Sequence, residues 1–263
     1  MNGPGPNADP RFVDYYAQGS ISETTMRRLE STRRATLAVR RKLSLPVETL
    51  EVVDVGCGAG PQALMWAQDG HRVYGIDISA PLIGVARQRA EQLAPGARFE
   101  VGSATALPMA DASVDVVLLS ELLEHMPEWM PVVDEALRIL RPGGVVYIST
   151  TNRLCPVQEE FHLPMYSWYP RALKKYCERK AVTTHGHWVQ FASFPAVHWF
   201  SFYELRDYLD SRGFAASDRF DEMEVGASGL RKTVVDAVRK FPPLRFIAQV
   251  LTPYTLVVGY RRL

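Results

Sequence analysis

The chain has 263 residues, 47% of them hydrophobic, which is enough to bury a sizeable core in one α/β domain. Its 30 basic and 29 acidic residues leave a formal net charge of +1, so the bulk charge gives no support for a nucleic-acid partner. Three cysteines without metal or redox spacing, and the lack of a long apolar run, argue against a disulfide-stapled secreted fold and a membrane-spanning helix and favour a cytoplasmic protein.

The N-terminal part is predicted to be a leader followed by helices. Residues 1–10 are rich in glycine, proline and asparagine and lack the apolar core of a signal peptide, so we expect a disordered leader. Residues 11–47 are predicted to form a helical cover, with an arginine-rich helix over about 22–43. One face of that helix is partly apolar, with Leu29, Ala35, Leu37 and Val39.

The basic side chains of this helix, Arg40 among them, have two interpretations. They form a solvated face, which is the usual role of such a charge run. Alternatively, the N-terminal helices close over a bound cofactor, and the side chain that covers it is Tyr15, Tyr16 or Arg34.

Residues 50–61, LEVVDVGCGAGP, predict a buried strand that enters a glycine-rich turn and the start of a helix. Gly56 and Gly58 let a ligand lie against bare backbone and allow conformations that a Cβ forbids. A second strand, 72–77, ends at Asp77, where a doubly wound sheet binds the two hydroxyls of a ribose. This stretch therefore predicts a protein that binds a nucleoside cofactor.

The spacing of the glycines bears on which cofactor is bound. A dinucleotide site typically uses G-x-G-x-x-G, whereas this chain has G-x-G-x-G followed at once by Pro61. Asp54, just before the glycines, suits a ligand with a cationic ammonium group better than an anionic phosphate. S-adenosylmethionine (SAM) has such a group, and a nicotinamide-binding oxidoreductase remains the alternative.

Alternating helices and strands follow, as in a parallel sheet with helical crossovers. The predicted helices cover 61–69, a segment that starts at Ser79, and 129–140, which the Arg141-Pro142-Gly143-Gly144 stretch ends. The predicted strands cover 98–101, 114–119, 145–150 and 215–221, with a last strand at 255–260.

The stretch VVDVGCGAG, followed in order by GIDIS and LRPGG, resembles the motifs of the class I SAM-dependent methyltransferases over about residues 48–153. The resemblance implies a doubly wound, seven-stranded α/β sheet within a methyltransferase domain at 48–263, its last strand antiparallel. It also implies a set of cofactor-binding residues: Asp54, Gly56, Cys57, Gly58, Asp77, Ile78, Ser103, Ala104 and Ser120. The loop GSATALP departs from the family, because Ser103 stands where an aspartate usually meets the adenine amino group.

The loop after the fourth strand, ELLEHMP, and the later STTNR stretch resemble those of the ubiquinone-biosynthesis O-methyltransferases. In that family two glutamates and a histidine are associated with a magnesium ion, which implies Glu121, Glu124 and His125 here. A base or a metal ion near the methyl group favours O-methylation, because a hydroxyl acceptor must lose its proton. Three interpretations therefore stay open: His125 is a base, the three side chains bind Mg²⁺, or Glu124 and His125 only start a helix.

Residues 151–200 are too long and too aromatic for a simple connection, and we expect a lid over the acceptor. Candidate substrate contacts are His162, Tyr166, Trp168, His187, His198 and Trp199. Each of these is also the kind of residue that packs in an ordinary core. The lid has no counterpart in the ubiquinone-biosynthesis family, so the acceptor is not implied by the resemblance.

Residues 229–253 contain five basic residues and one acid among many apolar ones. Such a segment either covers the edge of the sheet or lies on an anionic membrane as a peripheral contact. The sequence as a whole predicts a SAM-dependent methyltransferase that methylates a hydroxyl of a small hydrophobic or aromatic acceptor. An N- or C-methyltransferase and a non-catalytic SAM-binding module are the alternatives, and the oligomeric state is left open.

Overall fold

The computed structural model describes residues 10–157, 161–188, 196–223, 225–226 and 228–261. Almost all of the predicted leader, residues 1–9, lies outside the described residues. The chain divides into two compact units, which are described separately. Unit 1 comprises residues 1–122, 128–147 and 260–263, and unit 2 comprises residues 123–127 and 148–259.

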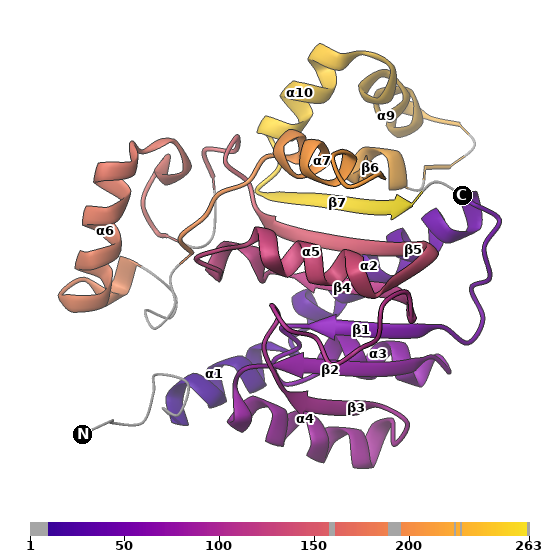
Figure 1. Ribbon diagram of the computed structural model, residues 1–263. Coiled ribbons are helices and arrows are strands. Elements are labelled where there is room, and N and C mark those ends of the chain that lie inside the picture. The colour runs from indigo at the N-terminus through magenta and orange to yellow at the C-terminus, as the bar shows by residue number, and fades with distance from the viewer. Residues whose placement is uncertain (1–9, 158–160, 189–195, 224, 227, 262–263) are drawn as a thin grey trace. The chain divides into compact units, whose positions relative to one another are not determined.

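A seven-stranded sheet has the order β3-β2-β1-β4-β5-β7-β6 (Figure 1). Its strands are β1 (Glu51–Val55), β2 (Arg72–Asp77), β3 (Arg98–Val101), β4 (Val114–Ser120), β5 (Leu140–Thr151), β6 (Phe214–Asp218) and β7 (Tyr254–Arg261). β1 pairs in parallel with both β2 and β4, and β2 pairs in parallel with β3. The carboxyl ends of these four strands therefore meet at one edge, which is where open α/β sheets bind their ligands.

The central strands form because their side chains are β-branched and apolar and are buried on both faces. Val52, Val53, Val55, Val116 and Val117 are all at most 1% exposed. The helices of this half are α3 (Pro61–Gln68), α4 (Ala80–Leu93) and α5 (Met130–Ile139). Strands and crossover helices agree with the prediction within one or two residues, which confirms the predicted fold class for this part.

The predicted N-terminal helices are α1 (Pro10–Gly19) and α2 (Glu23–Lys42), the latter capped by the Ser22 side chain. The burial of Leu29, Ala35 and Val39 is as predicted. Arg40 differs from the prediction, because it is buried instead of solvated. Its guanidinium donates to the carbonyl oxygens of Pro46 at 2.9 Å and Asp115 at 3.2 Å, which replaces the lost hydration.

The Arg141-Pro142-Gly143-Gly144 stretch was predicted to form a turn between helix and strand, and this boundary is wrong. β5 begins at Leu140, directly after α5. Leu140 already has extended dihedral angles of −73° and 130°, so the chain enters the strand without a separate turn. Gly143 takes a φ of 77°, and a Cβ on Gly144 would lie 2.8 Å from the carbonyl oxygen of Arg141, which accounts for both glycines.

Unit 2 contains β6, most of β7 and several helices. These are α6 (Arg171–Thr183), α7 (Phe202–Asp210), α8 (Arg219–Glu222), α9 (Leu230–Lys240) and α10 (Pro242–Val250). The predicted strand at 215–221 is too long, because Asp218 forms a capping box with Asp221 and starts α8 there. The segment 229–253 consists of two helices separated at Phe241, whose extended dihedral angles and following Pro242-Pro243 end the first helix.

The predicted lid, residues 151–200, has a hydrophobic cluster of its own around α6. Its members are Phe161, Tyr166, Cys177, Ala181, Ala196 and Trp199. The rings of Phe161 and Tyr166 stack with centroids 4.1 Å apart, and the ring of Trp199 meets Tyr166 edge-on at 5.2 Å. The insertion is therefore a packed substructure and not an irregular connection.

Candidate cofactor and active site

The glycine turn after β1 uses backbone conformations that only glycine adopts easily. Gly56, Gly58 and Gly60 have φ angles of 73°, 52° and 82°. The amides of Gly56 and Cys57 both donate to the carbonyl oxygen of Ile76, at 2.7 Å and 3.0 Å, which ties the turn to the end of β2. Within the part of the chain that the structure describes, a Cβ on Gly58 would meet only one atom, Cδ1 of Leu82 at 4.0 Å, so this side of the turn is open to a ligand.

Asp77 lies at the end of β2 and organises the same turn. Its Oδ2 accepts the amide of Gly58 at 2.9 Å, and its Oδ1 accepts the amide of Ser79 at 2.8 Å. Burial raises the pKa of this carboxyl, while the two backbone donors act in the opposite direction. Each carboxylate oxygen keeps a second lone pair, so the group can still accept hydrogen bonds from ribose hydroxyls.

Asp54 is the most unusual carboxyl of the turn, because it is 2% exposed and its Oδ2 has no hydrogen-bond partner among the described residues. Burial raises its pKa to about 7, against a backbone hydrogen bond from Ala63 that lowers it, and nearby Asp77 adds to the rise. A buried carboxylate with one unpaired oxygen is stabilised by a cationic donor. This chemistry suits a ligand with an ammonium group, and the binding of that group by Asp54 stays a prediction.

Gln62, in the first turn of α3, is a site residue that the sequence analysis missed. Its Oε1 accepts from the hydroxyl of Ser120 at 3.3 Å, whereas its Nε2 is buried without a partner. Ser120 ends β4, so the pair joins the first turn of α3 to the end of β4. The position of Gln62 directly after the predicted glycine turn and Pro61 was the one signal in the sequence that could have identified this residue.

The remaining predicted cofactor residues lie just after β1, β2 and β3. Ile78 is 71% exposed, which leaves its side chain free to cover a bound ring. Ser103 is exposed, and its Oγ accepts the amide of Thr105 at 3.2 Å, so it shapes its own turn. Cys57 is buried, and burial raises the pKa of its thiol. Ala104 is half-buried.

The N-terminal helices are bonded to the glycine turn through Arg89 of α4, a second residue that the sequence analysis missed. Its guanidinium donates to the carbonyl oxygens of Ala17 at 2.8 Å and Ala59 at 3.1 Å. Arg28 of α2 also lies 3.8 Å from Glu121, at the end of β4. Arg34, proposed to close over the cofactor, pairs instead with Glu30 within its own helix, and the side chain of Tyr15 is outside the described residues.

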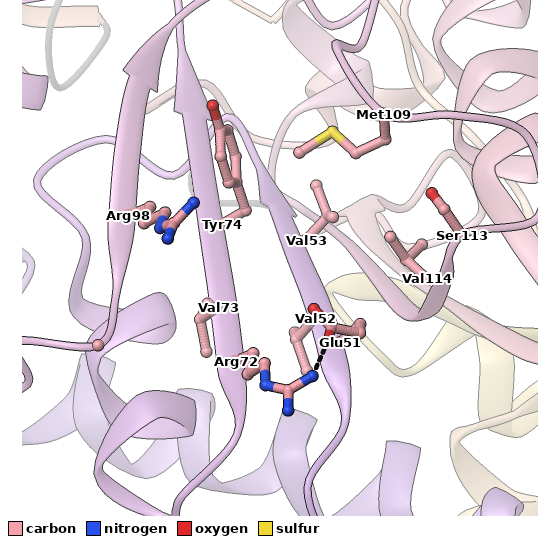
Figure 2. A pocket seen from close by; sticks show the side chains of 11 residues that line it. Glu51, Val52, Val53, Arg72, Val73, Tyr74, Arg98, Met109, Ser113 and Val114 are labelled. Carbon is pink, nitrogen blue, oxygen red and sulfur yellow. Dashed lines mark hydrogen bonds and ion pairs between the residues drawn. The ribbon is translucent and has the colours of Figure 1, made fainter.

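A cavity of about 400 Å³ lies elsewhere in unit 1. Figure 2 shows it over the first halves of β1 and β2, with Tyr74 and Val53 on the sheet and the Arg72 guanidinium bonded to Glu51 at 2.6 Å. These residues begin their strands, whereas the glycine turn follows the strand ends. The cavity is therefore separate from the candidate cofactor site.

In unit 2, the loop after β4 is fixed by Glu124, which is fully buried. Its Oε2 accepts the hydroxyl of Thr150 at 2.7 Å, and its carbonyl accepts the amides of Val197 and His198 at 2.8 Å and 3.1 Å. The ring Nε2 of His198 lies 3.0 Å from the carbonyl oxygen of Pro127. Thus Glu124 holds the loop against the end of the insertion, a structural role that differs from the open interpretation that Glu124 and His125 only start a helix. His125 follows it, and its side chain is half-buried.

The predicted magnesium set, Glu121, Glu124 and His125, is not supported. Across the described residues, no group of three or more His, Cys, Asp or Glu side chains is arranged to hold a metal ion. The hydrogen bonds of Glu124 to Thr150 and the ion pair of Glu121 with Arg28 use these carboxylates in other ways.

The predicted substrate contacts fall into three groups. Tyr166 and Trp199 belong to the core cluster of the insertion, so packing explains their burial. Trp168 and His187 are exposed, as is His162, whose ring Nδ1 lies 3.3 Å from the carbonyl oxygen of His187. His198 bonds the loop after β4. The structure does not test whether any of them contacts a substrate.

Comparison with known proteins agrees with this geometry. Residues 53–148 match the family described as "Methyltransferase domain". A probable S-adenosylmethionine-dependent methyltransferase of Mycolicibacterium smegmatis is 38% identical over 104 residues, which are 40% of this chain and 39% of that protein. A ubiquinone biosynthesis O-methyltransferase of Cupriavidus pinatubonensis is 32% identical over 154 residues, which are 57% of this chain and 61% of that protein. The chain thus matches roughly half the length of these curated relatives.

Solved structures share the fold. An S-adenosylmethionine-dependent methyltransferase from Mesorhizobium loti superposes with a TM-score of 0.55 at 18% identity, over 86% of this chain and 96% of that one. Matches at this identity show the fold alone. Residues 53–148 thus match a methyltransferase domain in sequence, and the chain shares the fold of SAM-dependent methyltransferases.

Proposed function

We propose that the protein is an enzyme that transfers the methyl group of SAM to a hydroxyl of a small hydrophobic or aromatic acceptor. The observation that carries the cofactor assignment is the buried Asp54, whose unpaired Oδ2 lies in the strand that leads into the open glycine turn. When bound there, SAM would supply an electrophilic methyl on a positively charged sulfur. The methyl donor needs no protonation, so the protein's work is to orient, to exclude water and to remove a proton.

In this proposal Asp54 binds the ammonium group, Asp77 accepts hydrogen bonds from the ribose hydroxyls, and the backbone at Gly58 lies against the ligand. Gln62 adds an amide donor, Nε2, which has no partner within the described protein and suits a carboxylate or hydroxyl oxygen of the ligand. His125 takes the proton from the acceptor hydroxyl, since a neutral imidazole is the commonest general base near neutral pH. Glu124 is assigned a positioning role, because its bonds to Thr150, Val197 and His198 fix the loop that carries His125.

The support for oxygen as the acceptor atom comes from relatives. Several of the similar curated proteins are named ubiquinone biosynthesis O-methyltransferase, and the loop ELLEHMP resembles theirs. However, an arsenite methyltransferase of Halobacterium salinarum is 37% identical over 123 residues, which are 45% of this chain and 31% of that protein. A [4+2]-cyclase also has the fold, with a TM-score of 0.53 at 18% identity. N-methylation, C-methylation and a role without methyl transfer therefore remain the competing functions.

The cofactor is tested by calorimetry with SAM, its demethylated product S-adenosylhomocysteine, and NAD. We expect binding of the first two and no heat with NAD. Tight binding of NAD together with silence toward SAM would replace the methyltransferase proposal with an oxidoreductase one.

The chemistry is tested with His125→Ala and a library of phenols and catechols. If His125 is the base, kcat falls by roughly 10²–10⁴ while the affinity for SAM stays near that of the wild type. The matched control is His185→Ala, a half-buried histidine of the insertion that is not among the candidate substrate contacts. Activity of His125→Ala within a few fold of the wild type, in the presence of a chelator, would reject base catalysis and favour an amine acceptor.

A further inference from the structure

The helices α9 and α10 expose an apolar surface that the rest of unit 2 does not cover. Seven large apolar residues of this segment are exposed, and the most exposed are Leu230 at 81% and Leu251 at 74%. The others are Val234, Phe241, Leu244, Phe246 and Ile247. We call these seven residues the apolar face. Contiguous exposed apolar residues of this kind mark interaction surfaces.

The apolar face exists because α10 is packed with its polar side inward. Asp218 is 0% exposed, and its Oδ2 accepts from Nε of Arg245 at 2.8 Å and from Nε2 of Gln249 at 2.6 Å. Leu244, Ile247 and Leu251 repeat at intervals of three and four residues and so share the side that points away from this buried carboxylate. A helix whose inner side is polar and outer side apolar is the reverse of the usual pattern for a water-exposed helix.

The same arrangement occurs in α9. Val235 is buried, and the Arg239 guanidinium donates to the carbonyl oxygens of Phe220 at 2.8 Å and Met223 at 2.7 Å. Leu230 and Val234, one turn apart, face outward. In both helices, therefore, an arginine forms hydrogen bonds to other elements of unit 2, and aliphatic side chains lie at the surface. The alternative that the segment only covers the sheet edge does not account for these exposed side chains.

The charges near the apolar face select among the partners it could have. Arg231 and Lys240 are exposed at the two ends of α9, and Lys232 is half-exposed beside Asp236. The segment 229–253 has only that one acid. Apolar side chains flanked by cations match an anionic lipid surface, where the former enter the acyl boundary and the latter meet the headgroups. Helices of 11 and 9 residues are too short to cross a bilayer, and no helix among the described residues is long and apolar enough to do so.

We propose that α9 and α10 dock the protein onto an anionic membrane surface, with the apolar face inserted and Arg231 and Lys240 on the headgroups. This inference goes beyond the proposed methyl transfer, because all its residues belong to unit 2 and none is assigned to the chemistry. It gives the enzyme a place at the lipid surface where hydrophobic acceptors accumulate.

The test is co-sedimentation of the full chain with vesicles of phosphatidylcholine alone or mixed with phosphatidylserine. We expect at least about tenfold tighter binding to the mixed vesicles, weakened by salt, because the cations meet an anionic surface. Leu230→Ser with Ile247→Ser should weaken binding at least about tenfold, because two apolar side chains no longer enter the bilayer. Arg231→Ser and Lys240→Ser should each weaken it about fivefold.

The matched control is Leu93→Ser, a leucine of α4 in unit 1 that is 55% exposed, close to the 53% of Ile247, and it should leave vesicle binding unchanged. Circular dichroism checks that every variant is folded. No binding to mixed vesicles, or equal binding by the Leu230→Ser/Ile247→Ser variant, would overturn the proposal. So would a dimer in analytical ultracentrifugation that this variant converts to a monomer, because the apolar face would then be a contact between two copies. Failure here leaves the calorimetric test of SAM binding untouched, so the two proposals are separable.

Discussion

At the scale of single residues, Asp54 links the fold to the cofactor through its ionisation. Its burial raises the pKa to about 7 in the ligand-free protein, so the neutral carboxyl predominates below that pH. An ammonium group of the ligand binds the ionised form of the Asp54 carboxyl, so binding below that pH releases the proton of this carboxyl. Affinity for S-adenosylhomocysteine should therefore rise about tenfold between pH 6 and pH 7.5, as the ionised fraction of a group with this pKa does. Calorimetry at fixed ionic strength measures it.

Asp54→Asn is the control for this pH dependence, because an amide cannot titrate. The variant should bind more weakly and with a flat profile over the same range. The linkage also has a stability consequence. Since the folded-state pKa is above the ordinary value, the protonated form stabilises the ligand-free fold below pH 3.8, and this contribution is lost as pH rises through about 7. A ligand affinity that is independent of pH in the wild type would contradict the assigned role.

Gly58 and Gly70 provide a matched pair at the same scale. Both have left-handed backbones, with φ of 52° and 89°, so an alanine at either position should cost about 1 kcal/mol of folding stability. Only the Cβ at Gly58 would stand where we place the ligand. Gly58→Ala should thus lower affinity for SAM at least about tenfold through steric exclusion, while Gly70→Ala leaves it unchanged. Equal affinities in the two variants would move the ligand away from this turn.

At the scale of elements, the ion pairs beneath α10 hold this helix to β6 and α8. Asp218 caps α8 through the amides of Phe220 and Asp221 and also accepts from Arg245 and Gln249. Asp218→Ala removes the cap of α8 and leaves the largely buried Arg245 guanidinium with Asp221 alone as its acidic partner, which should lower the free energy of unfolding by about 3 kcal/mol. Thermal denaturation of this variant, with exposed Asp210→Ala as the control, measures the loss. A change no larger than that of the control would show that α10 is held by other contacts.

The elements that the sequence predicted well are those with a local cause. Strands 72–77 and 98–101 were correct to the residue because alternating burial and a following turn fix their ends. The errors have non-local causes. Arg40 is buried because two carbonyl oxygens outside its helix accept its hydrogen bonds. One belongs to Pro46, just beyond the helix, and the other to Asp115, remote in the sequence. The inside-out packing of α10 depends on Asp218, 27 residues before Arg245, which no helical periodicity reveals.

The candidate site shows the same division between local and non-local information. Asp54, Gly58 and Asp77 follow from a glycine turn and a strand end, and they lie together because parallel strands share an edge. Gln62, Arg89 and Arg28 were missed because their bonds join segments that are distant in sequence. The magnesium set followed from resemblance alone, and the hydrogen bonds of Glu124 explain its burial without a metal ion.

At the scale of the whole molecule, the proposed cofactor site and the proposed docking surface belong to different units of the chain, while His125, the proposed base, lies in unit 2. The glycine turn, Asp77 and Gln62 belong to unit 1, whereas α9 and α10 belong to unit 2. Each site is complete within its own unit: the amide of Gly58 is held by Asp77, and Arg245 by Asp218. A ligand bound at the glycine turn should therefore leave the backbone hydrogen bonds of α9 and α10 unchanged, and vesicles bound at α9 and α10 should leave those of the glycine turn unchanged.

Hydrogen exchange of the full chain tests this independence. S-adenosylhomocysteine should slow exchange of amides over 54–60 and 76–79, because the ligand and the ordered turn exclude the openings that allow exchange. Mixed phosphatidylcholine and phosphatidylserine vesicles should slow exchange over 230–251 and not in the turn. Gly58→Ala should abolish the first effect alone, and Leu230→Ser with Ile247→Ser the second alone. Vesicles that protect the turn in the absence of ligand would mean that the units are energetically coupled, since protection at one site would then require a change of state at the other.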